Sequence, residues 1–320
     1  MKTTTFVLLL WVFSTIQIMG QENEMETWGV VYNSVGNLRA EPRHAAEMVT
    51  QVLLGMPVRI LEQKGGWRRV ETPEGYFGWI SGSVHPLADA GRKHYLAGAK
   101  VIVTLLHTRS YAEADETAPP VTDLVAGNML ELISADEGYY RVRYPDGRNA
   151  YVRKTDAEEV TDWLKGVKLT GESIVQTARQ LLGIPYLWGG TSVKGMDCSG
   201  FTKQVYWMHG VILPRDASQQ ACYGRLVDEG GELSDALPGD LLFFGSKATE
   251  GEDEKVVHVG IYLGERQFIH ASDYVRINSF DPADPLYDAF NTNRYLYTRR
   301  MIGEEQGEGM EELLSNAFYH

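Results

Sequence analysis

The hydrophobic pattern of the chain changes sharply after its first twenty residues. Lys2 is followed by an unbroken apolar run from Phe6 to Phe13, after which small and polar residues appear. A helix that spans a bilayer needs about 20 apolar residues, so this run is too short to cross one. Residues 1–20 are therefore predicted to be a secretory signal peptide, and the mature protein is expected in the periplasm or outside the cell. No later stretch of the sequence is apolar enough to predict a membrane span.

Short alternating apolar segments fill two blocks that resemble each other, residues 27–88 and 95–156. Gly and acidic residues separate the segments, which is typical of small antiparallel barrels. Related residues recur 72 positions apart, as in Val49 and Val121, Gly55 and Gly127, Trp67 and Tyr139, and Trp79 and Tyr151. A period of this length indicates a duplicated domain rather than a solenoid. The second copy is the more degenerate, and a short insertion is expected before its Val121.

The periodicity becomes helical after a linker at residues 157–172. Apolar residues recur at helical spacing between Ser173 and Leu182, and a glycine and a proline follow. From residue 173 to residue 302 the chain is predicted to be one α+β domain. The acidic tail, 303–320, is predicted to be solvated, with at most a short helix between Met310 and Phe318.

The chain has two cysteines, and the surroundings of Cys198 are the more informative. Asp197, Cys198 and Ser199 precede an apolar pattern with helical spacing, which puts Cys198 in the first turn of a predicted helix. The positive end of a helix dipole favours the thiolate form of a cysteine. Cys222 lacks such surroundings and is expected to be a small buried apolar residue. Their number alone also permits a disulfide between them.

Two of the eight histidines fall on one predicted β-hairpin. Alternation from Val256 to Tyr262 puts His258 on one face of the first strand, and the returning strand carries His270. If the loop has an odd number of residues, the two side chains share a face and lie about 7 Å apart. A nucleophilic cysteine needs an imidazole base, and the base needs a third group that holds its tautomer. The hairpin and Cys198 together predict this arrangement.

Six motifs extend this pattern from Ile174 to Arg299. They are Pro185-Tyr186-Leu187-Trp188-Gly189-Gly190, Asp197-Cys198-Ser199-Gly200-Phe201, Leu213-Pro214-Arg215-Asp216, Leu237-Pro238-Gly239-Asp240-Leu241-Leu242-Phe243-Phe244, His258-Val259-Gly260-Ile261-Tyr262 and His270-Ala271. In this order they resemble the NlpC-type cell-wall cysteine peptidases. The segments Asn37-Leu38-Arg39 and Gly75-Tyr76-Phe77-Gly78-Trp79 resemble bacterial SH3 domains. The resemblance implies an α+β papain-like catalytic domain preceded by two small SH3-like β-barrels.

The resemblance also assigns roles to residues of the predicted catalytic domain. Cys198 matches the nucleophile, His258 the base and His270 the orienting group. Tyr186 would form the oxyanion site together with the backbone N–H of Cys198. Neither a cofactor nor a metal is implied, because the histidine pair has no carboxylate or further thiol at ligand spacing.

The chain resembles a subgroup of this family that has SH3 domains before the catalytic domain. Its members cleave the bond between γ-D-glutamate and a diamino acid in murein peptides whose N-terminal L-alanine is free. An acidic residue and a tyrosine of the first SH3 domain hold the alanine amine, and the matching residues here are Glu41 and Tyr76. Asp197, Ser199 and Asp216 match other substrate contacts of the subgroup. The implied partner is thus an L-Ala-γ-D-Glu-diamino acid peptide, whose ammonium needs a carboxylate when buried.

Charge narrows the choice of partners further. The formal net charge of −13 argues against nucleic acid as the main partner.

Three other functions stay open at this point. The protein could be a murein endopeptidase that acts on intact wall with the SH3 pair as its anchor, a wall-binding protein without activity, or an acyltransferase on the same core.

Overall fold

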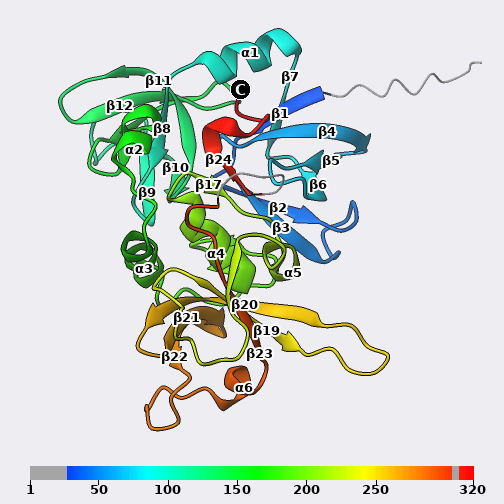
Figure 1. The fold of residues 1–320 in the computed structure, drawn as a ribbon. Helices are drawn as coiled ribbons and strands as arrows, with labels where there is room; N and C mark the ends of the chain where they lie inside the picture. The colour runs from blue at the N-terminus through cyan, green and yellow to red at the C-terminus, as the bar shows by residue number, and fades with distance from the viewer. Residues whose placement is uncertain (1–26, 305–309) are drawn as a thin grey trace, which may run out of the picture.

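The computed structural model describes residues 27–304 and 310–320, and the predicted signal peptide lies outside these residues. Two β-rich units come first in the chain, and a unit with a central antiparallel sheet and most of the helices follows them (Figure 1). We call them the N-terminal unit (27–87), the middle unit (100–159) and the C-terminal unit (171–302). In the described part of the chain, no helix is both long enough and apolar enough to cross a membrane.

The N-terminal unit is a seven-stranded antiparallel sheet with the order β3-β2-β6-β5-β4-β1-β7. Its strands are β1 (Thr27–Val31), β2 (Val35–Arg39), β3 (Met48–Leu53), β4 (Pro57–Lys64), β5 (Trp67–Glu71), β6 (Phe77–Ser81) and β7 (Val84–Leu87). Alternating apolar residues of these strands, such as Leu38, Val58 and Val70, form one buried core. The alternation seen in the sequence therefore encodes the side of each strand that faces inward.

The middle unit repeats this strand order as β10-β9-β13-β12-β11-β8-β14. Its strands are β8 (Lys100–Val103), β9 (His107–Tyr111), β10 (Pro120–Val125), β11 (Met129–Ala135), β12 (Tyr139–Arg143), β13 (Asn149–Arg153) and β14 (Ala157–Glu159). The duplication predicted from the 72-residue register is thus present in the fold. The expected insertion before Val121 is wrong, because β2 and β9 begin 72 residues apart and so do β3 and β10. The loops before β3 and β10 are therefore equally long.

Short helices connect the units. Helix α1 (Asp89–Ala97) joins the N-terminal and middle units, and Tyr95 on it is buried and donates a hydrogen bond to the carbonyl of Gly55 at 2.8 Å. The predicted linker contains β14, which completes the middle sheet, and α2 (Val160–Gly166), whose Trp163 is buried. The linker thus belongs to the packed structure on both sides.

The C-terminal unit combines a six-stranded antiparallel sheet with two packed helices. The sheet has the order β18-β23-β19-β20-β21-β22, formed by β18 (Arg225–Asp228), β19 (Leu241–Ser246), β20 (Lys255–Gly264), β21 (Gln267–Ser272), β22 (Tyr274–Ser279) and β23 (Tyr295–Arg300). The helices are α3 (Gly171–Gln180) and α4 (Cys198–Trp207), with the shorter α5 (Ala217–Gln220) and α6 (Ala289–Asn293) beside them. The small pairs β15 (Thr191–Ser192) with β16 (Gly195–Met196) and β17 (Val211–Ile212) with β24 (Glu311–Glu312) complete it. Phe201 of α4 and Phe243 of β19 are fully buried in the shared core.

The described part of the acidic tail, 310–320, packs against the protein instead of being solvated throughout, which corrects the sequence prediction. Strand β24 pairs with β17, and the 3-10 turn Leu313–Ser315 follows it. Met310, Leu313 and Phe318 are buried, and Phe318 packs edge-on against Trp28 of the N-terminal unit. In Figure 1 this red segment returns from the C-terminal unit towards β1 and α1. Three apolar residues spaced along a polar segment are enough to hold it, because each is buried against a different part of the molecule.

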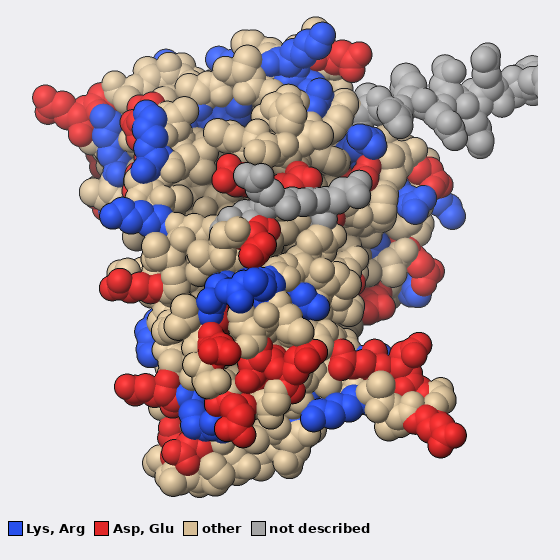
Figure 2. Space-filling model, viewed as in Figure 1, with Lys and Arg blue, Asp and Glu red and all other residues tan. Residues whose placement is uncertain are grey.

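The distribution of charged side chains on the surface is consistent with the composition of the chain. On the face shown in Figure 2, the described Lys and Arg residues lie in small groups among acidic ones and form no continuous basic surface. This distribution agrees with the formal net charge of −13. The prediction that nucleic acid is not the main partner therefore still depends on the charge of the protein alone.

Candidate active site

Cys198 is the first residue of α4, as the sequence predicts. Asp197 is the N-cap of this helix, and its carboxylate accepts a hydrogen bond from the backbone N–H of Gly200 at 2.8 Å. The thiol is 8% exposed and lines a cavity of about 320 Å³. The sulfur atom therefore belongs to the first turn of the helix, at the positive end of its dipole.

The Asp-Cys-Ser-Gly segment has a steric reason for its glycine. A Cβ atom at Gly200 would lie 1.9 Å from the carbonyl oxygen of Gly190, so no larger residue fits there. Asp197 also accepts a hydrogen bond from the N–H of Gly189 at 2.9 Å. The buried Arg215 side chain binds the same carboxylate and the Ser199 hydroxyl. The loop in front of Cys198 is thus fixed by one buried ion pair and close backbone packing.

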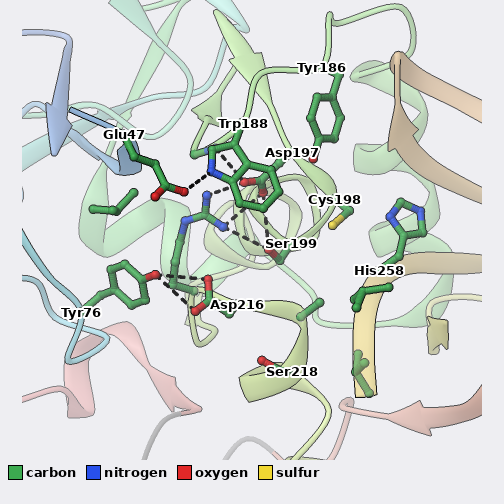
Figure 3. A pocket seen from close by; sticks show the side chains of 16 residues that line it. Glu47, Tyr76, Tyr186, Trp188, Asp197, Cys198, Ser199, Asp216, Ser218 and His258 are labelled. Carbon is green, nitrogen blue, oxygen red and sulfur yellow. Dashed lines mark hydrogen bonds and ion pairs between the residues drawn. The ribbon is translucent and has the colours of Figure 1, made fainter. Parts of the chain in front are cut away.

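His258 on β20 and His270 on β21 form a hydrogen-bonded pair. The Nε2 atom of His258 lies 2.7 Å from the Nδ1 atom of His270, which is hydrogen-bonding distance. Both rings are buried, and His258 lines the same cavity as Cys198 (Figure 3). The sequence prediction that the two histidines share a face of the hairpin is confirmed.

Burial shifts the ionisation of the thiol and the imidazole in opposite directions. It raises the pKa of Cys198 to about 11, assisted by the charge of Asp197 and opposed by the backbone N–H groups of Val259 and Ser199. It lowers the pKa of His258 well below its ordinary value, and the charge of His270 lowers it further. Burial thus opposes either charge alone, whereas proton transfer from thiol to imidazole creates two attracting charges in a poorly solvated site. We expect the two groups to gain and lose charge as a pair.

Tyr186 lies in the same cavity, in the segment that precedes β15. Burial raises the pKa of its hydroxyl, and negative charge on Cys198 raises it further. The hydroxyl is therefore protonated over the whole physiological range and can donate a hydrogen bond to a developing oxyanion.

The other end of the cavity is lined by both the N-terminal and the C-terminal unit (Figure 3). Glu47 comes from the loop before β3 and accepts a hydrogen bond from the indole of Trp188 at 2.8 Å. The Tyr76 hydroxyl, from the turn before β6, donates to Asp216 at 3.2 Å. Burial raises the pKa of Asp216, while the Arg215 guanidinium opposes the rise. Asp216 and Tyr76 are partly buried and Glu47 is exposed. Two carboxylates and a phenol in one place form a setting suited to an ammonium group.

Comparison with known proteins agrees with this geometry. The NlpC/P60 family model matches residues 183–300, and the model of the bacterial dipeptidyl-peptidase SH3 domain matches residues 38–83. A gamma-D-glutamyl-L-lysine dipeptidyl-peptidase of Bacillus cereus is 30% identical over 268 residues, which are 80% of this chain and 77% of that protein. This chain belongs to the NlpC/P60 family. Dipeptidyl-peptidase 6 of Lysinibacillus sphaericus is also 30% identical, over 81% of this chain and 93% of its own length.

A solved structure extends the likeness beyond the NlpC/P60 region. The crystal structure of an NlpC/P60 family protein from Bacillus cereus superposes with a TM-score of 0.73 at 25% identity. The superposition covers 86% of this chain and 99% of the other. The whole three-unit arrangement, and not only the NlpC/P60 region, is therefore shared.

The structure does not bring Glu41 into the cavity. Its carboxylate is largely exposed and pairs with Arg43 at 3.0 Å, and Glu41 is not among the residues that line the site. Glu47, six residues later in the same loop, is the carboxylate that does line it. The other sequence-predicted residues, Tyr76, Tyr186, Asp197, Ser199 and Asp216, all line this cavity of the NlpC/P60 protein.

Cys222 also differs from its prediction. It is exposed rather than buried, because it follows the short helix α5 on its solvent side, where the thiol lies 3.4 Å from the Ser218 carbonyl. Both cysteines are free, so the disulfide permitted by their number does not form.

Sequence reasoning gave no role to three residues that shape the site. Arg215 stands inside a quoted motif, and its position between two assigned acidic residues could have marked it as their partner. Trp188 also stands in a motif. Glu47 carried no signal, because nothing local to it shows that it faces the cavity.

Proposed function

We propose that this protein is a cysteine peptidase that hydrolyses the γ-D-glutamyl–diamino acid bond of murein peptides with a free N-terminal L-alanine. Two observations support the chemistry: the Cys198 thiol at a helix start and the His258 imidazole line one cavity, and His258 is hydrogen-bonded to the buried His270. The names of the Bacillus cereus and Lysinibacillus sphaericus relatives support the dipeptidyl-peptidase class. From the predicted signal peptide, we also propose that the protein is exported.

The observation that carries the proposal is the group of polar residues at the far end of the cavity. Glu47 and Asp216 offer two carboxylates for one ammonium, and Tyr76 fixes the position of Asp216. A peptide whose first residue ends in this place presents its second residue's side-chain carbonyl to the thiol. Cleavage at that carbonyl would release a dipeptide.

The reaction that we propose is acyl transfer through a thioester. The thiol proton of Cys198 moves to His258, and the sulfur attacks the γ-carbonyl carbon of D-glutamate. The Tyr186 hydroxyl and the Cys198 N–H donate hydrogen bonds to the oxyanion. Collapse of the tetrahedral intermediate breaks the C–N bond, and the leaving amine of the diamino acid takes the proton from His258. Water then attacks the thioester with His258 as base, which releases L-Ala-D-Glu and restores the thiol.

The alternative is an endopeptidase that acts on intact wall, in which the alanine amine is blocked. The two functions are separated by the peptide L-Ala-γ-D-Glu-L-Lys and its N-acetylated form, with products identified by mass spectrometry. A desolvated charge pair that loses one partner costs about 2–5 kcal/mol, so we expect the acetylated peptide to be cleaved roughly 30-fold more slowly or worse. Equal turnover of both peptides would favour the endopeptidase.

A further inference from the structure

Asn278 on β22 lies directly behind the histidine pair. In the register between β21 and β22, His270 is opposite Arg276 and Phe268 is opposite Asn278. His270 and Asn278 are thus diagonal neighbours on one face of the sheet, within reach of each other's side chains. The Asn278 Oδ1 atom lies 2.8 Å from the Nε2 atom of His270.

The orientation of the Asn278 amide follows from its second contact. Its Nδ2 group donates a hydrogen bond to the backbone carbonyl of Leu286 at 3.1 Å. A carbonyl oxygen can only accept, so the amide nitrogen must be on the Leu286 side and the amide oxygen must face His270. The Nε2 atom of His270 must then carry a hydrogen, because the amide oxygen is also only an acceptor.

This constraint passes from His270 to the catalytic base. A neutral imidazole with a hydrogen on Nε2 has a lone pair on Nδ1, so His270 accepts a hydrogen bond from the Nε2–H of His258. The Nδ1 atom of His258 is then the ring nitrogen left with a lone pair. That atom can receive the thiol proton of Cys198, while the Nε2 proton of His258 stays in its bond to His270.

Burial keeps His270 neutral, which the proposed proton transfer needs, and lowers its pKa to about 4. The hydrogen bond to Asn278 and the charge of Asp288 at the start of α6 favour its protonation. Arg276 on β22 and Arg294 after α6 oppose it. A neutral His270 can adopt either tautomer unless a neighbour selects one. Asn278 is that neighbour.

We propose that Asn278 is a positioning residue that selects the tautomers of His270 and His258 and so keeps the Nδ1 atom of His258 free for the proton of Cys198. The proposal rests on the cysteine-peptidase chemistry proposed above. Without the amide, His270 can carry its hydrogen on Nδ1, and His258 must then turn its lone pair towards His270. In that state the base has no acceptor for the thiol proton.

The test measures Cys198 directly and needs no peptide. In a Cys222→Ala background, we compare the rate constant for alkylation of Cys198 by iodoacetamide across pH in the parent, Asn278→Leu and Asn278→Asp. Asn278→Leu removes the acceptor, and we expect a loss of about 10-fold or more at neutral pH, since a wrong tautomer disables a catalytic histidine. Asn278→Asp keeps an acceptor and should restore most of the rate. Its added charge raises the pKa of His270, so the acid side of its profile should move to higher pH.

Nitrogen-15 spectra of labelled histidine supply a second, independent measurement. In the parent protein both His258 and His270 should carry their hydrogen on Nε2, and Asn278→Leu should show a mixture of tautomers. A hydrogen on Nδ1 of His270 in the parent overturns the proposal, even if Asn278→Leu fails to fold. Unchanged spectra together with an unchanged alkylation profile in Asn278→Leu overturn it as well. Because neither measurement uses a murein peptide, a wrong substrate assignment would leave the result readable.

Discussion

The N-terminal and middle units share one strand order but contribute differently to the site. In the N-terminal unit, Glu47 and Tyr76 line the cavity. At the positions 72 residues later, the middle unit has Pro119 and Arg148, and neither lines it. Arg148 instead pairs with Asp146 and stacks on Tyr144. Only one copy of the duplicated fold thus lines the cavity, because the difference lies in loops that the sheet does not constrain.

The two copies nevertheless hold the same small hairpin of the C-terminal unit. Gln51 accepts hydrogen bonds from the Thr191 N–H at 3.0 Å and the Ser192 hydroxyl at 2.9 Å. Its counterpart 72 residues later, Asp123, forms an ion pair with Lys194. Equivalent strand positions therefore keep an equivalent task even where the residue type has changed. The comparison teaches that both copies contact the C-terminal unit, whereas only the first copy lines the cavity.

The largest effect should come from replacing Cys198, the proposed nucleophile. This effect does not depend on the difference between the N-terminal and middle units. Cys198→Ala removes the nucleophile, so we expect kcat/KM to fall by about 10,000-fold or more. His258→Ala should be similarly severe, and His270→Asn should keep more activity. Hydrolysis of L-Ala-γ-D-Glu-L-Lys measures the loss, and thermal unfolding checks the fold. Cys222→Ala is the matched control, and loss of activity there instead would contradict the assignment.

The loss of stability at low pH should not depend on the N-terminal or the middle unit. The charged residues near His258 and His270 belong to the C-terminal unit. The pKa of His270 falls from 6.5 to about 4 on folding, so the unfolded chain binds more protons between these values. The free energy of unfolding should therefore decrease as pH falls through this window, by up to about 3 kcal/mol for this group. Urea unfolding at pH 7 and near pH 4 measures the change. His270→Asn should make it smaller, and an equal decrease in that variant would contradict the prediction.

The contrast between copies is sharpest at Glu47. Glu47→Gln keeps the shape of the side chain but removes its charge, so kcat/KM for the free-amine peptide should fall roughly 30-fold or more. The acetylated peptide has no ammonium to lose and should change little. Glu41→Gln, in the same loop, is the matched control and should stay close to the parent. A larger effect at Glu41 than at Glu47 would return the amine site to the sequence-based assignment.

The smallest effects should distinguish the two contacts that hold the β15–β16 hairpin, one from Gln51 and one from Asp123. Gln51→Ala leaves buried partners without hydrogen bonds, so we expect the free energy of unfolding to fall by about 1–3 kcal/mol. Asp123→Ala breaks a partly exposed ion pair and should cost about 0–1 kcal/mol. Urea denaturation of both variants makes the comparison. An equal or larger loss for Asp123→Ala would show that the middle unit contributes more to docking than its contacts suggest.

Local spacing was sufficient to predict much of the molecule. The 72-residue register predicted two copies of one sheet, because side-chain alternation and turn glycines are local properties of each strand. The start of α4 at Cys198 and the shared face of His258 and His270 followed from helical and strand periodicity. These features depend on a few neighbouring residues, so the sequence by itself determined them.

Tertiary packing decided what depends on distant partners. Glu41 and Glu47 stand in one loop, and only the docking of that loop against Trp188 determines which carboxylate faces the cavity. The tail was predicted to be solvated, yet Phe318 is buried against Trp28, which is 290 residues earlier in the chain. The tautomer selection proposed for Asn278 depends on the Leu286 carbonyl, which fixes the orientation of the Asn278 amide. In each case the deciding contact joins segments whose proximity exists only after the chain has folded.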